Sequence, residues 1–439
     1  MRKFNKLSLT AVAASAAFIG FTQSASAEVS VETAFIFNTL SFMFHGVLVM
    51  WMAAGFAMLE AGLVRTKNTT MQLTKNIALY SVAGIMFWAI GYNLMYMDVN
   101  GYMGSFALWS ASDPIDADGV FTGDDAAGYG AASDWFFQMV FVAATASIVS
   151  GALAERIKLL PFLIFTVVLT GILYPIQGSW TWGGGWLSEM GFSDFAGSTI
   201  VHSVGGWAAL TGAIILGARK GKYNADGSIN PMPGANLPLA TLGTFILWMG
   251  WFGFNGGSQL AAGTVGDITD IGRIFANTNM AASAGAVAAL ILTQLTYGQV
   301  DLTMVLNGAL AGLVSITAGP LEPSLFGALW IGAVGGVIVV LVIPLLDKLK
   351  IDDVVGAIPV HLVAGFWGTI VVPVYAPGTS FVTQIVGFAA IGAFVFVVSL
   401  VVWLILKATV GIRVSEEAEI MGLDTSELGM EAYPEFAKG

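Results

Sequence analysis

Two histidines are the residues of this chain best placed to do chemistry. The chain has only three histidines in 439 residues, and His202 and His361 each lie near the middle of an apolar stretch. Each belongs to the pattern V-H-x-V-x-G-aromatic, which begins at Val201 and at Val360. A neutral imidazole can accept or donate a hydrogen bond and can relay a proton. Structural packing is the alternative for any buried histidine, and we favour it for His45.

The composition is that of a protein that crosses a membrane several times. Hydrophobic residues make up 56% of the chain and charged residues only 10%, with a mean hydropathy of +0.80. A soluble domain is about 25% charged. These values exclude a cytosolic enzyme, a nucleic-acid-binding protein and a disordered chain, and they predict an all-α polytopic protein in a lipid bilayer. The chain has no cysteine, which excludes disulfides and thiol catalysis.

The first 27 residues have the features of a cleavable signal peptide. Arg2, Lys3 and Lys6 precede an apolar run, and small residues follow it up to Ala27. This order is typical of a secretory signal, with a first transmembrane helix as the alternative. Because the apolar core is short, we predict a signal over residues 1–27, a periplasmic mature N-terminus and a bacterial inner membrane as the location.

Eleven apolar stretches follow the signal. A helix needs about 20 apolar residues to cross the hydrocarbon core of a bilayer. Residues 28–410 would form the membrane domain, and residues 411–439 a polar cytoplasmic tail. The predicted spans are 33–63, 76–97, 135–154, 159–178, 199–218, 237–256, 279–297, 303–318, 324–346, 357–374 and 381–407.

The basic residues orient these spans. With the N-terminus outside, 13 of the 14 Lys and Arg beyond the signal fall on the cytoplasmic side, and only Arg273 falls outside. Cytoplasmic loops are enriched in Lys and Arg, so the asymmetry predicts a cytoplasmic C-terminus. The thirteen are Arg65, Lys67, Lys75, Arg156, Lys158, Arg219, Lys220, Lys222, Lys348, Lys350, Lys407, Arg413 and Lys438.

The two histidine patterns also indicate an inverted repeat. They would lie at matching depths of the fifth and tenth spans, which enter the membrane from opposite sides. Two halves of five helices would then be related by an axis in the membrane plane, with the eleventh span added. Inverted repeats are typical of transporters, in which the substrate path runs along the repeat interface.

Several ordered segments resemble the Amt/Mep/Rh ammonium transporter family, in its bacterial Amt branch. The segment 194–219, which opens with DFAGS, passes through VH and closes with GAR, looks like the family signature. Similar segments are 151–156 (GALAER), 182–185 (WGGG) and 251–255 (WFGFN). The resemblance implies eleven helices around one pore per subunit, homotrimers, no cofactor and no metal, and uptake of ammonium for nitrogen assimilation.

The resemblance assigns His202 and His361 to a twin-histidine pair in a narrow apolar pore, lined beside them by Trp251. Desolvating an ammonium ion costs tens of kcal/mol in the Born limit, and burial lowers the pKa of an amine. Ammonium, or methylammonium, can therefore give up its proton and cross as the neutral amine. Potassium has no proton to lose, which accounts for its exclusion. Flux of ammonia alone and flux with a separate proton are both compatible with the sequence.

The resemblance also places a recruitment site and a gate at the outer entrance. Phe141 and Trp182 would present ring faces to the cation, an attraction of about 2 kcal/mol or more when desolvated. Ser258 would supply a hydroxyl acceptor, and Phe254 would stack on Phe141 as the gate. Ordinary core packing is the alternative for each ring, since the chain has 29 Phe and 13 Trp.

Acidic residues raise two further questions at the ends of the pore. Asp194 is the one carboxylate that opens a predicted span beside the entrance, and it could attract the cation or cap the helix. Its spacing to Gly197 favours the cap. On the other side, Asp352 and Asp353 precede the tenth span, but Gly356 stands where many relatives carry another Asp. The network that this acid would join is therefore in doubt.

The tail resembles the Amt C-terminal region from Arg413 through Gly422 to Pro434. The resemblance implies that the tail couples subunits and helps to receive a PII-type signalling protein that blocks the pore. A solvated acidic tail without a partner is the alternative.

Facilitated ammonium uptake is the function that these features favour. An ammonium sensor that uses the same site for signalling is the alternative, although no kinase or cyclase segment follows Gly411. A urea or water channel would not need two histidines in inverted repeats. An enzyme is the least favoured class, because we find no nucleophile–base constellation, cofactor motif or metal-ligand cluster.

Overall fold

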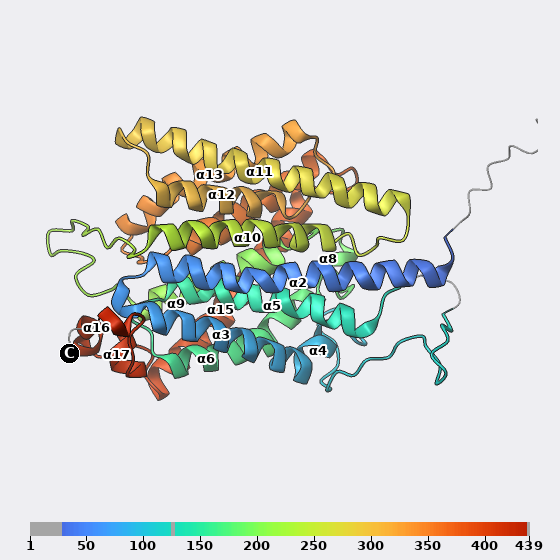
Figure 1. Ribbon diagram of the computed structural model, residues 1–439, viewed down its shortest axis with the longest axis horizontal. Helices are drawn as coiled ribbons and strands as arrows, with labels where there is room; N and C mark the ends of the chain where they lie inside the picture. The colour runs from blue at the N-terminus through green and yellow to red at the C-terminus, as the bar shows by residue number, and fades with distance from the viewer. Residues whose placement is uncertain (1–28, 124–127, 437–439) are drawn as a thin grey trace, which may run out of the picture.

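The computed structural model describes residues 29–123 and 128–436. The predicted signal peptide and Lys438 lie outside the described residues. The described residues form helices, with isolated β-bridges but no β-strand. The long helices lie roughly side by side in an elongated bundle (Figure 1). The prediction of an all-α membrane protein is confirmed.

Each of the eleven predicted stretches has a helical counterpart in the described chain. Nine are long and apolar enough to cross a membrane by length and composition. They are α2 (Val31–Leu63), Thr66–Tyr96, α5 (Ala131–Ala152), Leu159–Ser179, Ser198–Leu216, α10 (Leu237–Gly257), α11 (Val265–Tyr297), α13 (Leu325–Lys348) and α15 (Phe381–Thr409). Two are shorter apolar helices, α12 (Leu302–Ile316) and Ile358–Val374.

Four of these stretches are interrupted by π-helical turns. Such turns often mark functional sites within α-helices. The second stretch contains α3 (Thr69–Met86), η2 (Phe87–Gly91) and α4 (Tyr92–Tyr96), and the fourth contains α6 (Leu159–Val168), η3 (Leu169–Leu173) and α7 (Tyr174–Ser179). The fifth begins with η4 (Ser198–Ser203) before α9 (Val204–Leu216), and the tenth with η5 (Ile358–Val363) before α14 (Ala364–Val371).

Small residues allow the helices to pack closely. At Gly55 and Gly62 of α2 and at Gly243 and Gly250 of α10, an added Cβ atom would collide with the neighbouring helix. Membrane helices lack a hydrophobic force between them and associate through such close backbone contacts. Large apolar side chains such as Phe245 remain exposed on the outer surface, as a lipid-facing surface requires.

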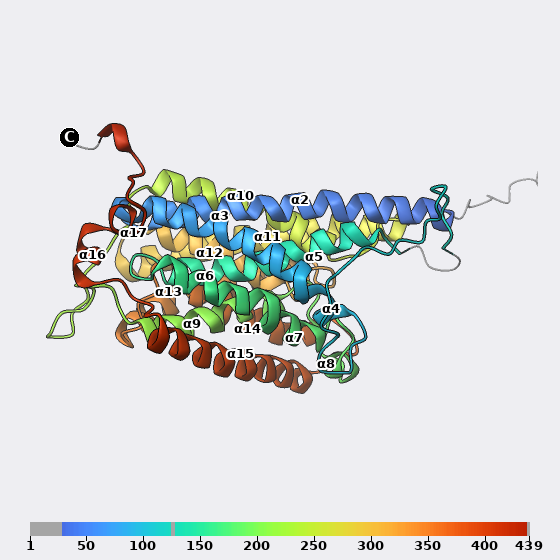
Figure 2. The same cartoon turned by 90° about the horizontal axis from the view of Figure 1, so that it is seen from below.

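The polar tail closes one end of the bundle, which we call the tail end. The short helices α16 (Glu416–Met421) and α17 (Leu423–Leu428) lie there, at the left in Figure 2, whereas α2 begins at the opposite end. The Asp424 carboxylate accepts hydrogen bonds from the backbone N–H groups of Thr70 (2.9 Å) and Met71 (2.7 Å), at the start of α3. Lys67 Nζ donates to the Glu419 carbonyl at 2.9 Å. The tail thus satisfies N–H groups that the first turn of α3 leaves unpaired.

We predict that Asp424→Ala loosens the tail from the bundle. The variant leaves two N–H groups of α3 without an acceptor, and loss of a helix cap costs about 1 kcal/mol. Limited proteolysis of the purified protein should cut the tail faster than in the wild type. Glu431→Ala, which removes an exposed acid from the same tail, is the control. Equal cleavage rates for Asp424→Ala and the control would contradict the prediction.

Candidate functional site

His202 and His361 meet inside the bundle. Their Nδ1 atoms lie 3.2 Å apart, and the two rings stack with centroids 5.2 Å apart. One ring must donate and the other accept in this contact, because each neutral imidazole carries a single N–H. His202 is fully buried, whereas His361 keeps 4% of its surface exposed. The structure therefore brings together two residues that lie 159 positions apart in the chain.

The two histidines are positioned by the same local structure. Each lies on a six-residue π-helical segment, η4 for His202 and η5 for His361. In both halves an aspartate precedes the histidine by eight residues and a left-handed glycine by five, as the numbering shows. This shared arrangement extends the seven-residue sequence pattern to a structural pattern, D-x-x-G-x-x-x-V-H.

Asp194 forms the first of these two arrangements. Its carboxylate accepts hydrogen bonds from four backbone N–H groups at the start of η4, with distances of 2.8–3.0 Å. The backbone carbonyl of Asp194 accepts a hydrogen bond from Trp182 Nε1 at 2.9 Å. Burial raises the pKa of the Asp194 carboxyl, and the four N–H groups lower it in part. These contacts are those of a helix cap. The donors are Gly197, Ser198, Thr199 and Ile200.

Asp353 and Gly356 form the second arrangement. The Asp353 carboxylate accepts from the N–H groups of Gly356 (3.1 Å) and Ile358 (2.7 Å) at the start of η5, and burial raises its pKa. Gly356 has φ +81°, and an added Cβ atom would lie 2.9 Å from Asn307 Nδ2. A side chain at this position would therefore be strained and crowded. Gly356 is the counterpart of Gly197, at φ +108°, which gives a structural reason for the departure from the family pattern.

Stacked aromatic rings cover the histidine pair on one side. Phe141 and Phe254 stack with centroids 3.9 Å apart and planes 22° apart, and the Phe254 ring lies 5.2 Å from the His202 ring. Trp182 meets Phe141 edge-on at 6.1 Å. The Trp251 ring stacks on His202 at 4.8 Å, and its Nε1 donates to Thr317 Oγ1 at 2.8 Å. A continuous row of ring contacts thus leads from Trp182 through Phe141 and Phe254 to the imidazole of His202.

A cavity of about 330 Å³ lies on the far side of this stack. It contains the predicted recruitment residues Phe141, Trp182 and Ser258 together. The Ser258 hydroxyl donates to the Phe254 carbonyl at 2.8 Å, which leaves its oxygen lone pairs free to accept. The remaining lining residues are Tyr92, Tyr96, Met97, Tyr129, Asp134, Phe137, Gln138, Phe195 and Leu260.

Asp134 is a site residue that the sequence reasoning missed. It lies in the first turn of α5 and lines the cavity, with Tyr92 donating to its carboxylate and Gln138 Nε2 donating at 3.2 Å. The prediction that Asp194 is the one carboxylate opening a span beside the entrance is therefore wrong. The available signal was the position of Asp134 at the end of an acidic loop, directly before an apolar stretch.

His45 takes no part in this arrangement. Its Nδ1 lies 2.9 Å from the Ser41 carbonyl oxygen, and its ring meets Phe275 edge-on at 6.1 Å. These contacts are those of a packed, hydrogen-bonded histidine. Among the described residues, no group of three His, Asp or Glu side chains is arranged to hold a metal ion.

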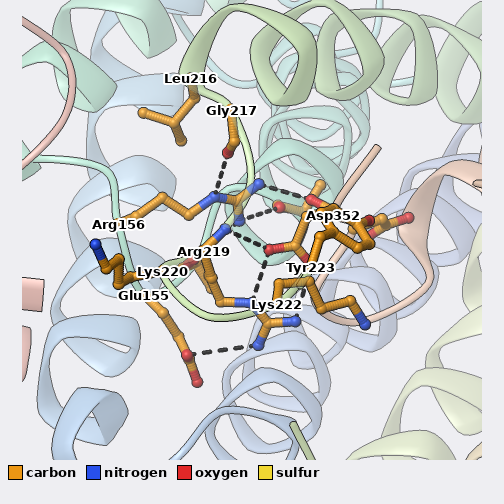
Figure 3. A network of polar contacts seen from close by, with 12 residues as sticks. Glu155, Arg156, Leu216, Gly217, Arg219, Lys220, Lys222, Tyr223 and Asp352 are labelled. Atoms are coloured by element: carbon orange, nitrogen blue, oxygen red, sulfur yellow. Dashed lines mark hydrogen bonds and ion pairs between the residues drawn. The ribbon is translucent and has the colours of Figure 1, made fainter. Parts of the chain in front are cut away.

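Buried ion pairs hold the tail end together (Figure 3). Arg219 donates to both Asp352 oxygens at 2.9 Å and lies 3.4 Å from Glu155. Arg156 Nη2 donates to the Asp352 carbonyl at 2.6 Å, and Arg65 pairs with Glu155. Burial alone would raise the pKa of Asp352, but the hydrogen bond from Arg219 and the charges of Arg156 and Arg219 hold it well below its ordinary value. Against the effect of burial, the charges of Arg219 and Arg65 likewise lower the pKa of the Glu155 carboxyl.

The position of Lys75 differs from the sequence prediction. We placed it among the loop cations, but it lies within α3 and is fully buried. Its Nζ donates to the Ser150 carbonyl at 2.8 Å and lies 5.0 Å above the Phe162 ring. α3 therefore begins well before the apolar run that predicted it.

The fold and the site together are those of a membrane transport protein, with two histidines in contact inside an apolar helical bundle. The Ammonium Transporter Family model matches residues 40–433. The chain is 40% identical to ammonium transporter Amt2 of Archaeoglobus fulgidus, over 89% of this chain and 87% of that protein. It is 41% identical to ammonium transporter Amt2 of Haloferax mediterranei, over 89% of this chain and 88% of that protein.

Solved structures give the same result. A sensor Amt protein superimposes with a TM-score of 0.82 at 36% identity, over 90% of this chain and 99% of that one. Mep2 of Candida albicans superimposes with a TM-score of 0.78 at 27% identity, over 93% of each chain. The chain belongs to the ammonium transporter family.

We predict that Asp194→Ala destabilises the protein. Four N–H groups lose their acceptor in a buried place, which should cost at least about 2 kcal/mol. The melting temperature of the purified protein should fall, and Asp194→Asn should fall between the wild type and the alanine variant, because one amide oxygen remains. Asp267→Ala removes a more exposed carboxylate, which accepts a hydrogen bond from the Thr264 backbone N–H at the start of α11, and should have a smaller effect. An unchanged melting temperature for Asp194→Ala would rule out the cap.

We also predict a pH dependence for the Arg219–Asp352 pair. The pKa of Asp352 is lower in the folded than in the unfolded chain, where it is about 3.9. The pair therefore stabilises the protein above about pH 4, and this stabilisation is lost as the pH falls toward the folded-state pKa. The difference in melting temperature between the wild type and Asp352→Asn should be constant near neutral pH and shrink below about pH 4. A difference that does not vary with pH would show that the carboxylate charge is not the source.

Proposed function

We propose that this protein moves ammonium across a bacterial inner membrane through a twin-histidine pore. The observation that carries the proposal is the His202–His361 contact directly behind the Phe141–Phe254 stack. In this proposal the signal over residues 1–27 is removed, the cavity beside Trp182 opens to the periplasm and the tail end faces the cytoplasm. The eleven helical stretches would span as two inverted halves of five with α15 added, and the matched structure around η4 and η5 supports that repeat.

The periplasmic cavity would recruit ammonium. Phe141 and Trp182 offer ring faces that attract a cation, and Ser258 offers a hydroxyl acceptor. Asp134 adds a carboxylate to the same lining. A negative group in a low-dielectric cavity raises the local concentration of cations.

The Phe141–Phe254 stack would act as the gate. Its rings lie 3.9 Å apart, so they must separate for a molecule to pass. Directly behind them the rings of Phe254 and Trp251 lie against the His202 imidazole, and a bare cation entering there would lose its hydration. Burial disfavours the charged amine, so the proton leaves and ammonia enters. An ion without a proton to lose is rejected at this step.

The histidine pair would then guide ammonia. His202 Nε2 is buried and has no hydrogen-bond partner among the described residues. A buried polar atom without a partner is unusual in a folded protein and calls for an explanation. A passing ammonia molecule supplies N–H groups and a lone pair, which match the donor and acceptor atoms of two neutral imidazoles.

Assembly and regulation complete the proposal. We infer a homotrimer, and a tail (residues 411–439) that receives a PII-type signalling protein. Two contacts support the role of the tail. Arg413 and Glu419 of the tail form an ion pair, and the Glu419 carboxylate accepts a hydrogen bond from the Lys220 N–H at 2.6 Å, beside Arg219. A partner that moves the tail would therefore act directly on the residues next to the pore exit.

An ammonium sensor is the second candidate. The solved structure of a sensor Amt protein is similar over nearly its whole length. A sensor could keep the recruitment cavity and bind ammonium without conducting it. Flux measurements separate the two functions.

We predict ammonium-dependent flux from the purified protein in liposomes. Ammonium gradients should change the internal pH, whereas potassium gradients should not. Current recorded in parallel distinguishes neutral ammonia flux from net charge transfer. The absence of any ammonium-dependent signal, with ammonium binding retained, would favour the sensor.

The histidine variants test the pore assignment. His202→Ala and His361→Ala each remove one imidazole and half of the central hydrogen bond, so ammonium selectivity over potassium should fall. His45→Ala removes a histidine that lies outside the pore, and it is the matched control. If both pore variants conduct and select as the wild type does, the twin-histidine role is wrong.

A further inference from the structure

A buried carboxylate lies on the tail side of the histidine pair. Glu60 belongs to α2, three residues before the helix ends, and only 1% of it is exposed. An acid inside a membrane bundle is costly, and such residues mark ion or proton pathways. The pore described above makes no use of Glu60, although it lies on the path from the histidines to the tail end.

One oxygen of Glu60 is fully engaged and the other is not. Oε2 accepts from Asn76 Nδ2 and Ser150 Oγ, each at 2.8 Å, and from Gln72 Nε2. No described residue donates a hydrogen bond to Oε1. Three donors from two neighbouring helices therefore fix the carboxylate and leave one oxygen available.

Lys75 lies in the same buried network as Glu60. Its ammonium group is fully buried and is held by the Ser150 carbonyl at 2.8 Å, so Ser150 contacts both groups. Burial disfavours the ionised form of both groups, and the opposite charge of each partner favours it. Glu60 can thus be restored as a carboxylate after it has taken and released a proton.

A small cavity joins Glu60 to the pore. It is lined by both Glu60 and His361, and its volume of about 10 Å³ suits about one water molecule. Asn307 and Val355 also line it, and the same two residues line a cavity of about 160 Å³ at the tail end. Both histidines are buried, but 4% of the His361 surface is accessible and none of the His202 surface is. The order is therefore histidine pair, small cavity with Glu60, and tail-end cavity.

We propose that Glu60 is the proton acceptor that connects His361 to the tail-end cavity, so that a proton held by the histidine pair crosses separately from ammonia. When His361 is an imidazolium, its N–H bond breaks and the proton passes to a water molecule in the small cavity. That water gives one of its own protons to Glu60 Oε1, and both side chains become neutral. Glu60 then returns the proton to the water of the small cavity and is a carboxylate again, and the proton passes on to water in the tail-end cavity beside Asn307 and Val355, which line both cavities.

A purely structural role for Glu60 makes a different prediction. In that case the network exists to tie α2, α3 and α5 together, and any loss of a donor to the carboxylate should harm transport as much as loss of its charge. The relay needs a titratable oxygen facing His361 and tolerates the loss of one donor. Variants that separate charge from hydrogen bonding therefore decide between the two.

The inference rests on the proposed function, and the test is a liposome assay that records ammonium-induced current together with internal pH. Glu60→Gln keeps the shape and one acceptor oxygen but cannot take up a proton. We expect its current to fall by about 100-fold, the typical contribution of a positioned proton acceptor. Ammonia permeation, seen as alkalinisation of the liposome interior, should persist. Ser150→Ala removes one donor and keeps both charges, so it should retain most of the current.

Two further variants protect the test against misfolding. Glu60→Gln leaves Lys75 uncompensated, so Glu60→Gln/Lys75→Met removes both charges, an exchange that buried pairs often tolerate. The double variant should also lose current and keep ammonia permeation. Glu60→Asp retains a titratable group and should keep more current than Glu60→Gln.

The outcomes are distinct. Wild-type current in either variant that lacks the Glu60 carboxylate would overturn the relay, as would equal losses in Ser150→Ala and Glu60→Gln. Ammonia flux without current in the wild type would also overturn it, while leaving the proposed transport function intact. The absence of any ammonium-dependent signal in the wild type would instead refute the transport function itself.

Discussion

The cost of placing a charge inside an apolar bundle governs this structure. Each buried acid in the described chain has donors or cations around it that offset this cost. Asp194 is surrounded by four backbone N–H groups, and Asp352 by the fork of Arg219. Around the histidine pair the neighbouring rings are those of Trp251, Phe254 and Phe56, none of which carries a charge. The same constraint that shapes the fold therefore supports a path for a neutral molecule.

The constraint also explains why two aspartates share one arrangement. A π-helical segment displaces a side chain from the register of an ordinary α-helix, and its first N–H groups need acceptors. Asp194 and Asp353 provide these acceptors, each eight residues before a histidine. In each half, a glycine with positive φ between the aspartate and the histidine turns the backbone into the π-helical segment. Each capping acid thus helps to position an imidazole without touching it, by fixing the backbone that carries the histidine.

The sequence predicted the elements well and the contacts only in part. Hydropathy located a helix for each of the eleven stretches, and the motif residues Phe141, Trp182 and Ser258 do line one cavity. Asp134 and Lys75 were missed or misplaced because their environment comes from other segments: Tyr92 and Gln138 for the acid, Ser150 and Phe162 for the lysine. Apolar periodicity cannot reveal such partners. Apolar periodicity also placed the start of α3 too late. Lys75 is hydrogen-bonded to Ser150 of another helix, and the sequence pattern alone does not distinguish such a buried lysine from a loop residue.

The pseudo-symmetry of the site is broken where direction is needed. The rings of Trp251 and Phe254 lie beside His202, whereas the ring of Phe56 lies beside His361, with its centroid 6.2 Å away. Ring faces attract a cation, which suits the side of the proposed entrance, where the substrate arrives as ammonium. A carboxylate with a free oxygen suits the side where a proton must be taken up and released, and Glu60 lies there. Two halves with the same backbone arrangement can therefore act as entrance and exit, because the side chains around each imidazole differ in chemistry.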